Sequence, residues 1–210
     1  ASNFSMRLKP NMPAIINTGG ARHTSINIAF PVDSSLISWR KYPCNPVIPD
    51  RPKQFLRTDM RDPYVFSDND QYYMIVGFGI DEPQGSHGAL LLYKSCDLKK
   101  WNYVGLLFEV NPSKDHSGRF WEMPVFKKMG KKWILSVNRV PEPGIPARTQ
   151  YWIGSFKRER FVPDNPIPQN LEVINRLLSP SVSDTPSGKT VAIAIIPDEI
   201  KIGRASCRER

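Results

Sequence analysis

Short apolar runs alternate with segments rich in turn-forming residues along most of the chain. The runs are rich in Val, Ile, Tyr, Phe and Trp, and Pro and Gly separate them, which is typical of β-strands joined by turns. No segment places apolar residues at the i, i+3, i+4 and i+7 positions of a long amphipathic helix. The pattern therefore predicts an all-β protein. The predicted strands cover residues 14–18, 25–30, 63–66, 72–77, 88–95, 101–105, 124–126, 133–137, 151–156, 181–182 and 190–196.

Three hairpins repeat one arrangement, in which a strand begins at an X-Pro pair, a tight turn follows, and an apolar strand returns. They cover residues 60–77, 121–137 and 178–195, and their starts recur about every 60 residues. Such repeats are typical of a β-propeller, because a single sheet cannot bury both of its faces without stacked neighbours. The repeat predicts a partial propeller with about three blades, and a β-sandwich is the alternative. In a propeller the first strand of each blade begins at the mouth of the central channel, where ligands bind.

Two carboxylates near these strand starts carry the candidate chemistry. Asp62 and Glu122 are predicted to occupy the same place in the first two repeats, where the third repeat has Ser179 or Pro180. If the repeats are neighbouring blades, the two carboxylates converge on one pocket. Cleavage of a glycosidic bond needs such a pair, because a protonated carboxyl donates to the leaving oxygen while an ionised one faces the cationic transition state.

The neighbours of the two carboxylates predict a division of roles. Trp121 and Phe120 would surround Glu122 with apolar walls that raise its pKa, as a general acid requires. Arg61 would keep Asp62 ionised and donate to a substrate hydroxyl. An Arg-Asp-Pro triplet alone is more typical of a capped turn, and a Trp-Glu pair alone is equally unspecific. The interpretation therefore depends on their shared place in the repeat.

Residues 61–63 (Arg-Asp-Pro) and 121–124 (Trp-Glu-Met-Pro) resemble the Arg-Asp-Pro and Trp-Glu-Cys-Pro motifs of glycoside hydrolase family 32. This family contains the invertases, inulinases, levanases and related fructosyltransferases. The resemblance covers residues 12–200, and it implies a five-bladed β-propeller that is usually followed by a β-sandwich. Further stretches that resemble the family are residues 39–48, 90–105, 150–156 and 161–164.

The resemblance also implies roles for the candidate residues in a retaining enzyme that releases terminal β-linked fructose from sucrose or fructans. Glu122 would be the general acid/base, and Asp62 would stabilise the transition state by binding hydroxyls of the fructosyl ring. Arg61 and Trp121 are expected to bind the substrate. Met123 stands where the family has Cys, a change that removes no essential group.

The family's nucleophile is an Asp in a Trp-Met-Asn-Asp-Pro-Asn-Gly-like motif near the start of the propeller, and these 210 residues do not contain that motif. We therefore expect residues 1–201 to be an internal part of the catalytic propeller, inactive without the missing blades and nucleophile. Residues 202–210 can be encoded by ATC GGA AGA GCG TCG TGT AGG GAA AGA, which matches a sequencing adapter. We interpret this tail as an artefact.

Composition narrows the classes of partner. The 29 Lys and Arg against 20 Asp and Glu give a net charge of +9, but the basic residues are dispersed without a nucleic-acid motif, so no nucleic-acid partner is expected. No stretch approaches the roughly 18 to 20 apolar residues of a membrane span, so no membrane partner is expected. Three Cys provide no disulfide framework, and His23, His87 and His116 lack the spacing of metal ligands. We expect no metal and no cofactor.

Other functions stay open at this point. Five-bladed propeller glycosidases of the arabinan or xylan type act by inversion with three acidic residues, and a propeller without its catalytic set would bind carbohydrate without turnover. The sequence does not separate hydrolase from fructosyltransferase, or sucrose from inulin or levan. It leaves the oligomeric state and location open, and an extracellular or periplasmic full-length protein fits a polysaccharide-degrading relative.

Overall fold

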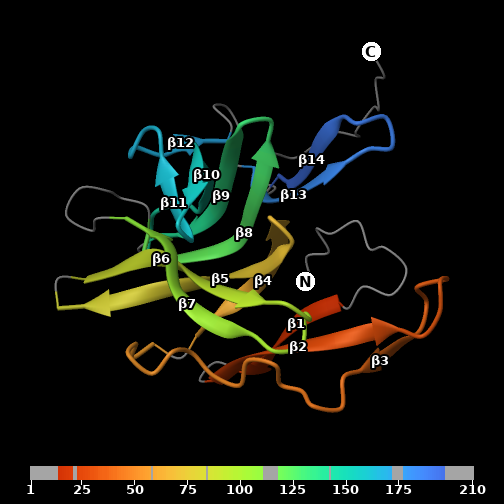
Figure 1. Cartoon of the computed structure of the whole chain (residues 1–210). Helices are drawn as coiled ribbons and strands as arrows, with labels where there is room; N and C mark the ends of the chain where they lie inside the picture. Colours follow the sequence, from red (N-terminus) through yellow and green to blue (C-terminus); the bar gives the residue numbers. More distant parts are fainter. Residues whose placement is uncertain are drawn as a thin grey trace, which may run out of the picture.

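The computed structural model describes residues 14–20, 23–57, 59–83, 85–110, 118–141, 143–171 and 177–196, with side chains from residue 24 onward. All regular elements within these ranges are β-strands. Four antiparallel sheets follow one another along the chain (Figure 1). The predicted all-β class is therefore confirmed.

The first sheet contains β1 (Ala14–Gly20), β2 (His23–Pro31) and β3 (Trp39–Lys41). The second contains β4 (Arg61–Asp68), β5 (Gln71–Glu82), β6 (Gly85–Ser95) and β7 (Asn102–Glu109). The third contains β8 (Phe120–Met129), β9 (Lys132–Val140), β10 (Arg148–Lys157) and β11 (Arg160–Pro163), with β12 (Gln169–Asn170) also paired to β10. The last is the hairpin of β13 (Leu178–Asp184) and β14 (Thr190–Ile195).

The second and third sheets are complete blades, in which strands adjacent in sequence pair with each other. Their first hairpins close through tight turns that need left-handed backbone. Asn69 and Asp70 have φ of 49° and 61° between β4 and β5, and Gly130 has φ of 61° between β8 and β9. Asn, Asp and Gly tolerate this region best, so turn chemistry sets the register of each hairpin.

Aromatic side chains fill the layer between the two complete blades. The rings of Phe126 and Trp133 stack 4.6 Å apart, and the Phe66 ring of β4 meets Phe126 edge-on at 5.0 Å. A second apolar cluster, which includes Ile26 and Met60, joins the second sheet to the first. Strand β4 is therefore held by packing on both sides, and it lies beside β8 of the next blade (Figure 1).

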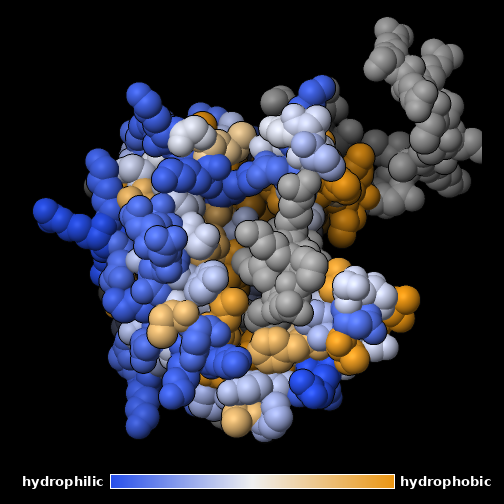
Figure 2. Space-filling view, turned by 45° about the vertical axis from the view of Figure 1, so that its right-hand side comes forward, coloured by the Kyte–Doolittle hydropathy of each residue, from blue (hydrophilic) through white to orange (hydrophobic). Residues whose placement is uncertain are grey.

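The propeller is not closed within the described residues, which contain two complete sheets and two shorter ones. Strand β14 exposes Ile193 and Ile195 at 76% and 62% of their surface. Figure 2 shows hydrophobic surface on the right of the molecule and a mostly hydrophilic face on the left. Uncovered apolar side chains on a terminal hairpin are expected where stacking of the repeats is incomplete. The predictions for residues 1–13, His116 and residues 202–210 fall outside the described residues.

Among the described residues there is no helix with the length and apolar character needed to cross a membrane.

Candidate active site

The first strand of each hairpin repeat carries a β-bulge at its X-Pro pair. In β4, β8 and β13 the residue before the proline has left-handed backbone, with φ of 55° at Asp62, 50° at Met123 and 54° at Ser179. A bulge re-aims the neighbouring side chains, so consecutive residues no longer simply alternate between faces. The register shifts lie at residues 61–64, 122–125 and 178–181.

These bulges correct the sequence prediction by one residue. Asp62 is equivalent to Met123 and Ser179, because each directly precedes the proline of its strand, whereas Glu122 is equivalent to Arg61. The prediction that Asp62 and Glu122 occupy the same place in the repeat is therefore wrong. The structure still brings them together, because the Met123 N–H donates to Asp62 Oδ2 at 2.9 Å across the junction of the blades.

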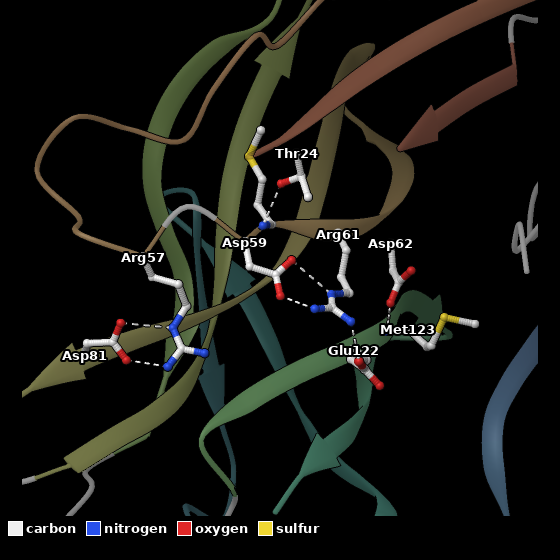
Figure 3. A network of polar contacts seen from close by, with 9 residues as sticks. Thr24, Arg57, Asp59, Arg61, Asp62, Asp81, Glu122 and Met123 are labelled. Carbon is white, nitrogen blue, oxygen red and sulfur yellow. Dashed lines mark hydrogen bonds and ion pairs between the residues drawn. The ribbon is translucent and has the colours of Figure 1, made fainter. Parts of the chain in front are cut away.

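Arg61 links the two strands at this junction (Figure 3). Its Nη1 donates to Glu122 Oε1 at 2.9 Å, and its guanidinium also pairs with both carboxylate oxygens of Asp59. The guanidinium carbon lies 4.9 Å from the centroid of the Phe120 ring, within the range of a cation–π contact. The predicted site residues Arg61, Asp62 and Glu122 thus form one cluster with Asp59 and Phe120.

Burial dominates the electrostatics of both candidate carboxyls. Loss of solvent raises the pKa of Glu122, and this effect outweighs the opposing charge of Arg61, while the negative charges of Asp62 and Asp59 raise it further. The predicted direction for Glu122 is confirmed. Burial also raises the pKa of Asp62, although the Met123 N–H and Arg61 oppose it. The sequence predicted that Arg61 would hold the pKa of Asp62 down. This prediction is wrong, because the net shift is upward.

Trp121 does not line the site. Its side chain is 0% exposed and packs in the core, with ring centroids 5.7 Å from Phe108 and 5.3 Å from Trp152. A Cβ on Gly88 would lie 2.2 Å from the indole, so this glycine makes room for it. The expectation that Trp121 binds substrate is corrected: the residue anchors the start of β8 and thereby fixes the position of Glu122.

Asp59 is the member of the cluster that the sequence reasoning missed. The only signal is its spacing, because residues two apart in an extended segment project to the same side, as Asp59 and Arg61 do. A second pair lies next to it, in which Arg57 binds both carboxylate oxygens of Asp81. The guanidinium carbon of Arg57 is 5.7 Å from the centroid of the Phe120 ring.

The described residues contain no group of three or more His, Cys, Asp or Glu side chains arranged to hold a metal ion. His87 is buried, and its Nε2 lies 3.4 Å from Glu109 Oε2. The side chain of His23 is not among those described.

The fold and cluster define an open β-propeller with two half-buried carboxyls of raised pKa where the first strands of adjacent blades meet. The profile of the Glycosyl hydrolases family 32 N-terminal domain matches residues 4–195. The chain belongs to this family, and its sheets are part of the five-bladed propeller of that domain. Membership favours fructan-type relatives over the arabinan- or xylan-type alternative.

Curated relatives and solved structures agree with this assignment. The extracellular exo-inulinase of Aspergillus ficuum is 32% identical over 152 residues, which cover 67% of this chain and 27% of the relative. The levanase of Bacillus subtilis is 28% identical over 176 residues, which cover 79% of this chain and 24% of the levanase. The β-fructofuranosidase of Bombyx mori superposes with a TM-score of 0.65 at 25% identity. The superposition covers 87% of this chain and 39% of the Bombyx mori enzyme. The chain thus spans about a quarter of the length of the curated relatives named here.

Proposed function

We propose that the whole protein to which this chain belongs hydrolyses terminal β-fructosidic bonds of sucrose or fructans with retention of configuration. The observation that supports this proposal best is the meeting of the Glu122 and Asp62 strands, where Arg61 Nη1 lies 2.9 Å from Glu122 Oε1 and the Met123 N–H donates to Asp62 Oδ2 at 2.9 Å. Burial raises the pKa of Glu122, which is the direction required of a group that protonates a leaving oxygen. Family membership supplies the substrate class.

Glu122 would act twice in this reaction. It first protonates the departing glycosidic oxygen while the nucleophile attacks the anomeric carbon, and it then removes a proton from the water that releases fructose. The nucleophile would be the Asp of the family motif, which lies outside these 210 residues.

Asp62 would serve the fructosyl ring. Its Oδ2 accepts the Met123 N–H at 2.9 Å, which fixes the carboxylate and leaves Oδ1 to accept a substrate hydroxyl. Hydrogen bonds to ring hydroxyls that strengthen in the transition state contribute several kcal/mol in glycosidases. Arg61, held against Glu122, supplies positive charge beside the two carboxyls.

The substrate and location follow the relatives in this proposal. The exo-inulinase of Aspergillus ficuum is described as extracellular, and the Bacillus subtilis relative is a levanase. We therefore propose a sucrose or fructan substrate and action outside the cytoplasm.

The test uses the full-length gene product with sucrose, inulin and levan, and it measures fructose release. Replacement of Glu122 by Ala should lower kcat/KM by about 10²- to 10⁴-fold, the usual contribution of general acid–base catalysis. On β-fructosyl fluoride, whose leaving group needs no protonation, azide should restore the turnover of the Ala variant and give a fructosyl azide, because a small anion can replace the water that needs a base. The control is Glu159→Gln, in the turn between β10 and β11 at the far end of the blade, which should retain wild-type activity.

Release of arabinose or xylose in place of fructose would contradict the proposed substrate. A full-length protein that binds fructan but turns over none of these substrates would instead support the non-catalytic alternative.

A further inference from the structure

Asp59 lies in the segment before β4 and holds the Arg61 side chain in a fork. Arg61 Nε donates to Asp59 Oδ1 at 3.1 Å, and Arg61 Nη2 binds Asp59 Oδ2. The remaining nitrogen, Nη1, donates to Glu122 at 2.9 Å. One guanidinium therefore bridges two carboxylates with all three of its nitrogens (Figure 3).

We propose that Asp59 is a positioning residue, which clamps Arg61 against Glu122 and thereby sets the orientation and charge of the acid/base. The inference rests on the proposed function of the same site. Asp59 would touch neither the substrate nor the reacting atoms.

The clamp is built from more than one contact. The Met60 N–H donates to the buried Thr24 Oγ1 at 2.9 Å, which fixes the backbone next to Asp59 to β2. The Phe120 ring supports the guanidinium of Arg61 from one side. A free Arg side chain samples many rotamers, so a bidentate partner is an efficient way to keep Nη1 directed at Glu122.

The clamp also balances charge. Glu122 must be protonated for one step and ionised for the next, whereas an uncompensated guanidinium 2.9 Å away would favour only the ionised form. The negative charge of Asp59 opposes that effect and raises the pKa of Glu122. Removal of the Asp59 charge should therefore lower the pKa of Glu122.

The chain provides a matched control in Asp81. It binds Arg57 with two carboxylate contacts, and Arg57 lies beside the same Phe120 ring, but the contacts of this pair do not include Glu122. Asp81→Asn removes the same kind of charge from the same neighbourhood without touching the proposed clamp.

The experiment compares Asp59→Asn, Asp59→Ala and Asp81→Asn in the full-length protein. The first measurement is the pH profile of kcat/KM on sucrose and on β-fructosyl fluoride, whose leaving group needs no protonation. Both Asp59 variants should shift the basic limb of the sucrose profile to lower pH and lose about tenfold or more at neutral pH, a part of the acid–base contribution. Turnover of the fluoride should change by about twofold at most, and Asp81→Asn should match the wild type.

Equal losses on both substrates would mean that Asp59 acts only on stability or binding, and an unshifted basic limb would overturn the clamp. A second measurement needs no turnover: titration of Glu122 by ¹³C NMR in protein with labelled glutamate. Asp59→Asn should lower this pKa and Asp81→Asn should not, and an unmoved value would refute the proposal. A wild type that titrates as expected but releases no fructose would refute the proposed function and leave the clamp standing.

Discussion

At Gly77 the backbones of the two complete blades approach each other closely beside the site, and Gly77→Ala tests how tightly packing controls the position of Glu122. A Cβ on this residue would lie 2.4 Å from the carbonyl oxygen of Trp121 and 3.1 Å from that of Arg61. Ordinary contacts begin at 3.4 Å, so β8 would have to withdraw by about 1 Å. The obstructing atoms are backbone and cannot rotate away.

The expected cost has two parts. Overpacking of a core junction costs about 1–3 kcal/mol, which denaturant unfolding of the full-length protein would measure. Glu122 directly follows Trp121, so the same withdrawal lengthens its 2.9 Å bond to Arg61. A misplacement of about 1 Å at a catalytic group can cost about 100-fold, so kcat/KM on sucrose should fall by about that factor.

Gly130→Ala is the matched control for this experiment. Nothing lies within 4 Å of a Cβ at Gly130, and its φ of 61° makes alanine strained by about 1–2 kcal/mol. The control should therefore lose similar stability and keep its activity. If Gly77→Ala keeps kcat/KM within about twofold of the wild type, the close approach of the blades does not position Glu122, and the reasoning is refuted.

Three further predictions concern stability. Trp121→Ala should cost about 3–5 kcal/mol in denaturant unfolding, because it empties a core position, and a raised KM with unchanged stability would restore Trp121 as a substrate contact. Glu122→Gln should stabilise the folded protein at neutral pH. Because the pKa of Glu122 is raised in the folded state, folding stability falls as pH rises from the ordinary carboxyl range through the raised value. Glutamine does not ionise, so it removes that loss. Thermal unfolding should show this gain disappearing at acid pH, and a gain that persists at acid pH would contradict the linkage. Asn138→Ala should cost about 1–3 kcal/mol by the same unfolding assay, because Asn138 Oδ1 accepts the Ser179 N–H at 2.9 Å and the Thr149 hydroxyl at 2.6 Å. Unchanged stability would show that this junction carries little of the fold.

The strands and turns could be predicted from sequence because their signals are local. Alternating apolar residues and turn pairs such as Asn69-Asp70 specify hairpins without reference to the rest of the chain. The repeat of X-Pro starts then predicted which strands are equivalent, and hence that β4 and β8 lie side by side. This placed Arg61, Asp62 and Glu122 near one another, and the structure agrees.

The bulges, the burial of Trp121 and the contact of Asp59 depend on information that the local sequence does not contain. A bulge shifts the side chains by one position, and nothing in the triplet Arg-Asp-Pro reveals whether the residue before proline adopts φ of 55°. Trp121 looked like a binding residue because it adjoins Glu122, yet the pleat sends its indole into the core. Asp59 was missed because its partner is decided by a side-chain rotamer.

The bulge is a feature of the repeated hairpin, and the proposed active site depends on it. Ser179 has the same left-handed backbone as Asp62 and Met123, although its strand presents no carboxylate at this position. Its N–H is held by Asn138 Oδ1 of the preceding blade, just as the Met123 N–H is held by Asp62. A polar side chain from one blade thus fixes the bulge of the next at both junctions.

Asp62 therefore has two tasks, because the carboxylate proposed to bind the fructosyl ring also joins the blades. Replacement of Asp62 by Ala should consequently lower stability as well as activity, whereas Asp62→Asn, which keeps an oxygen for the Met123 N–H, should retain most of the stability and lose activity.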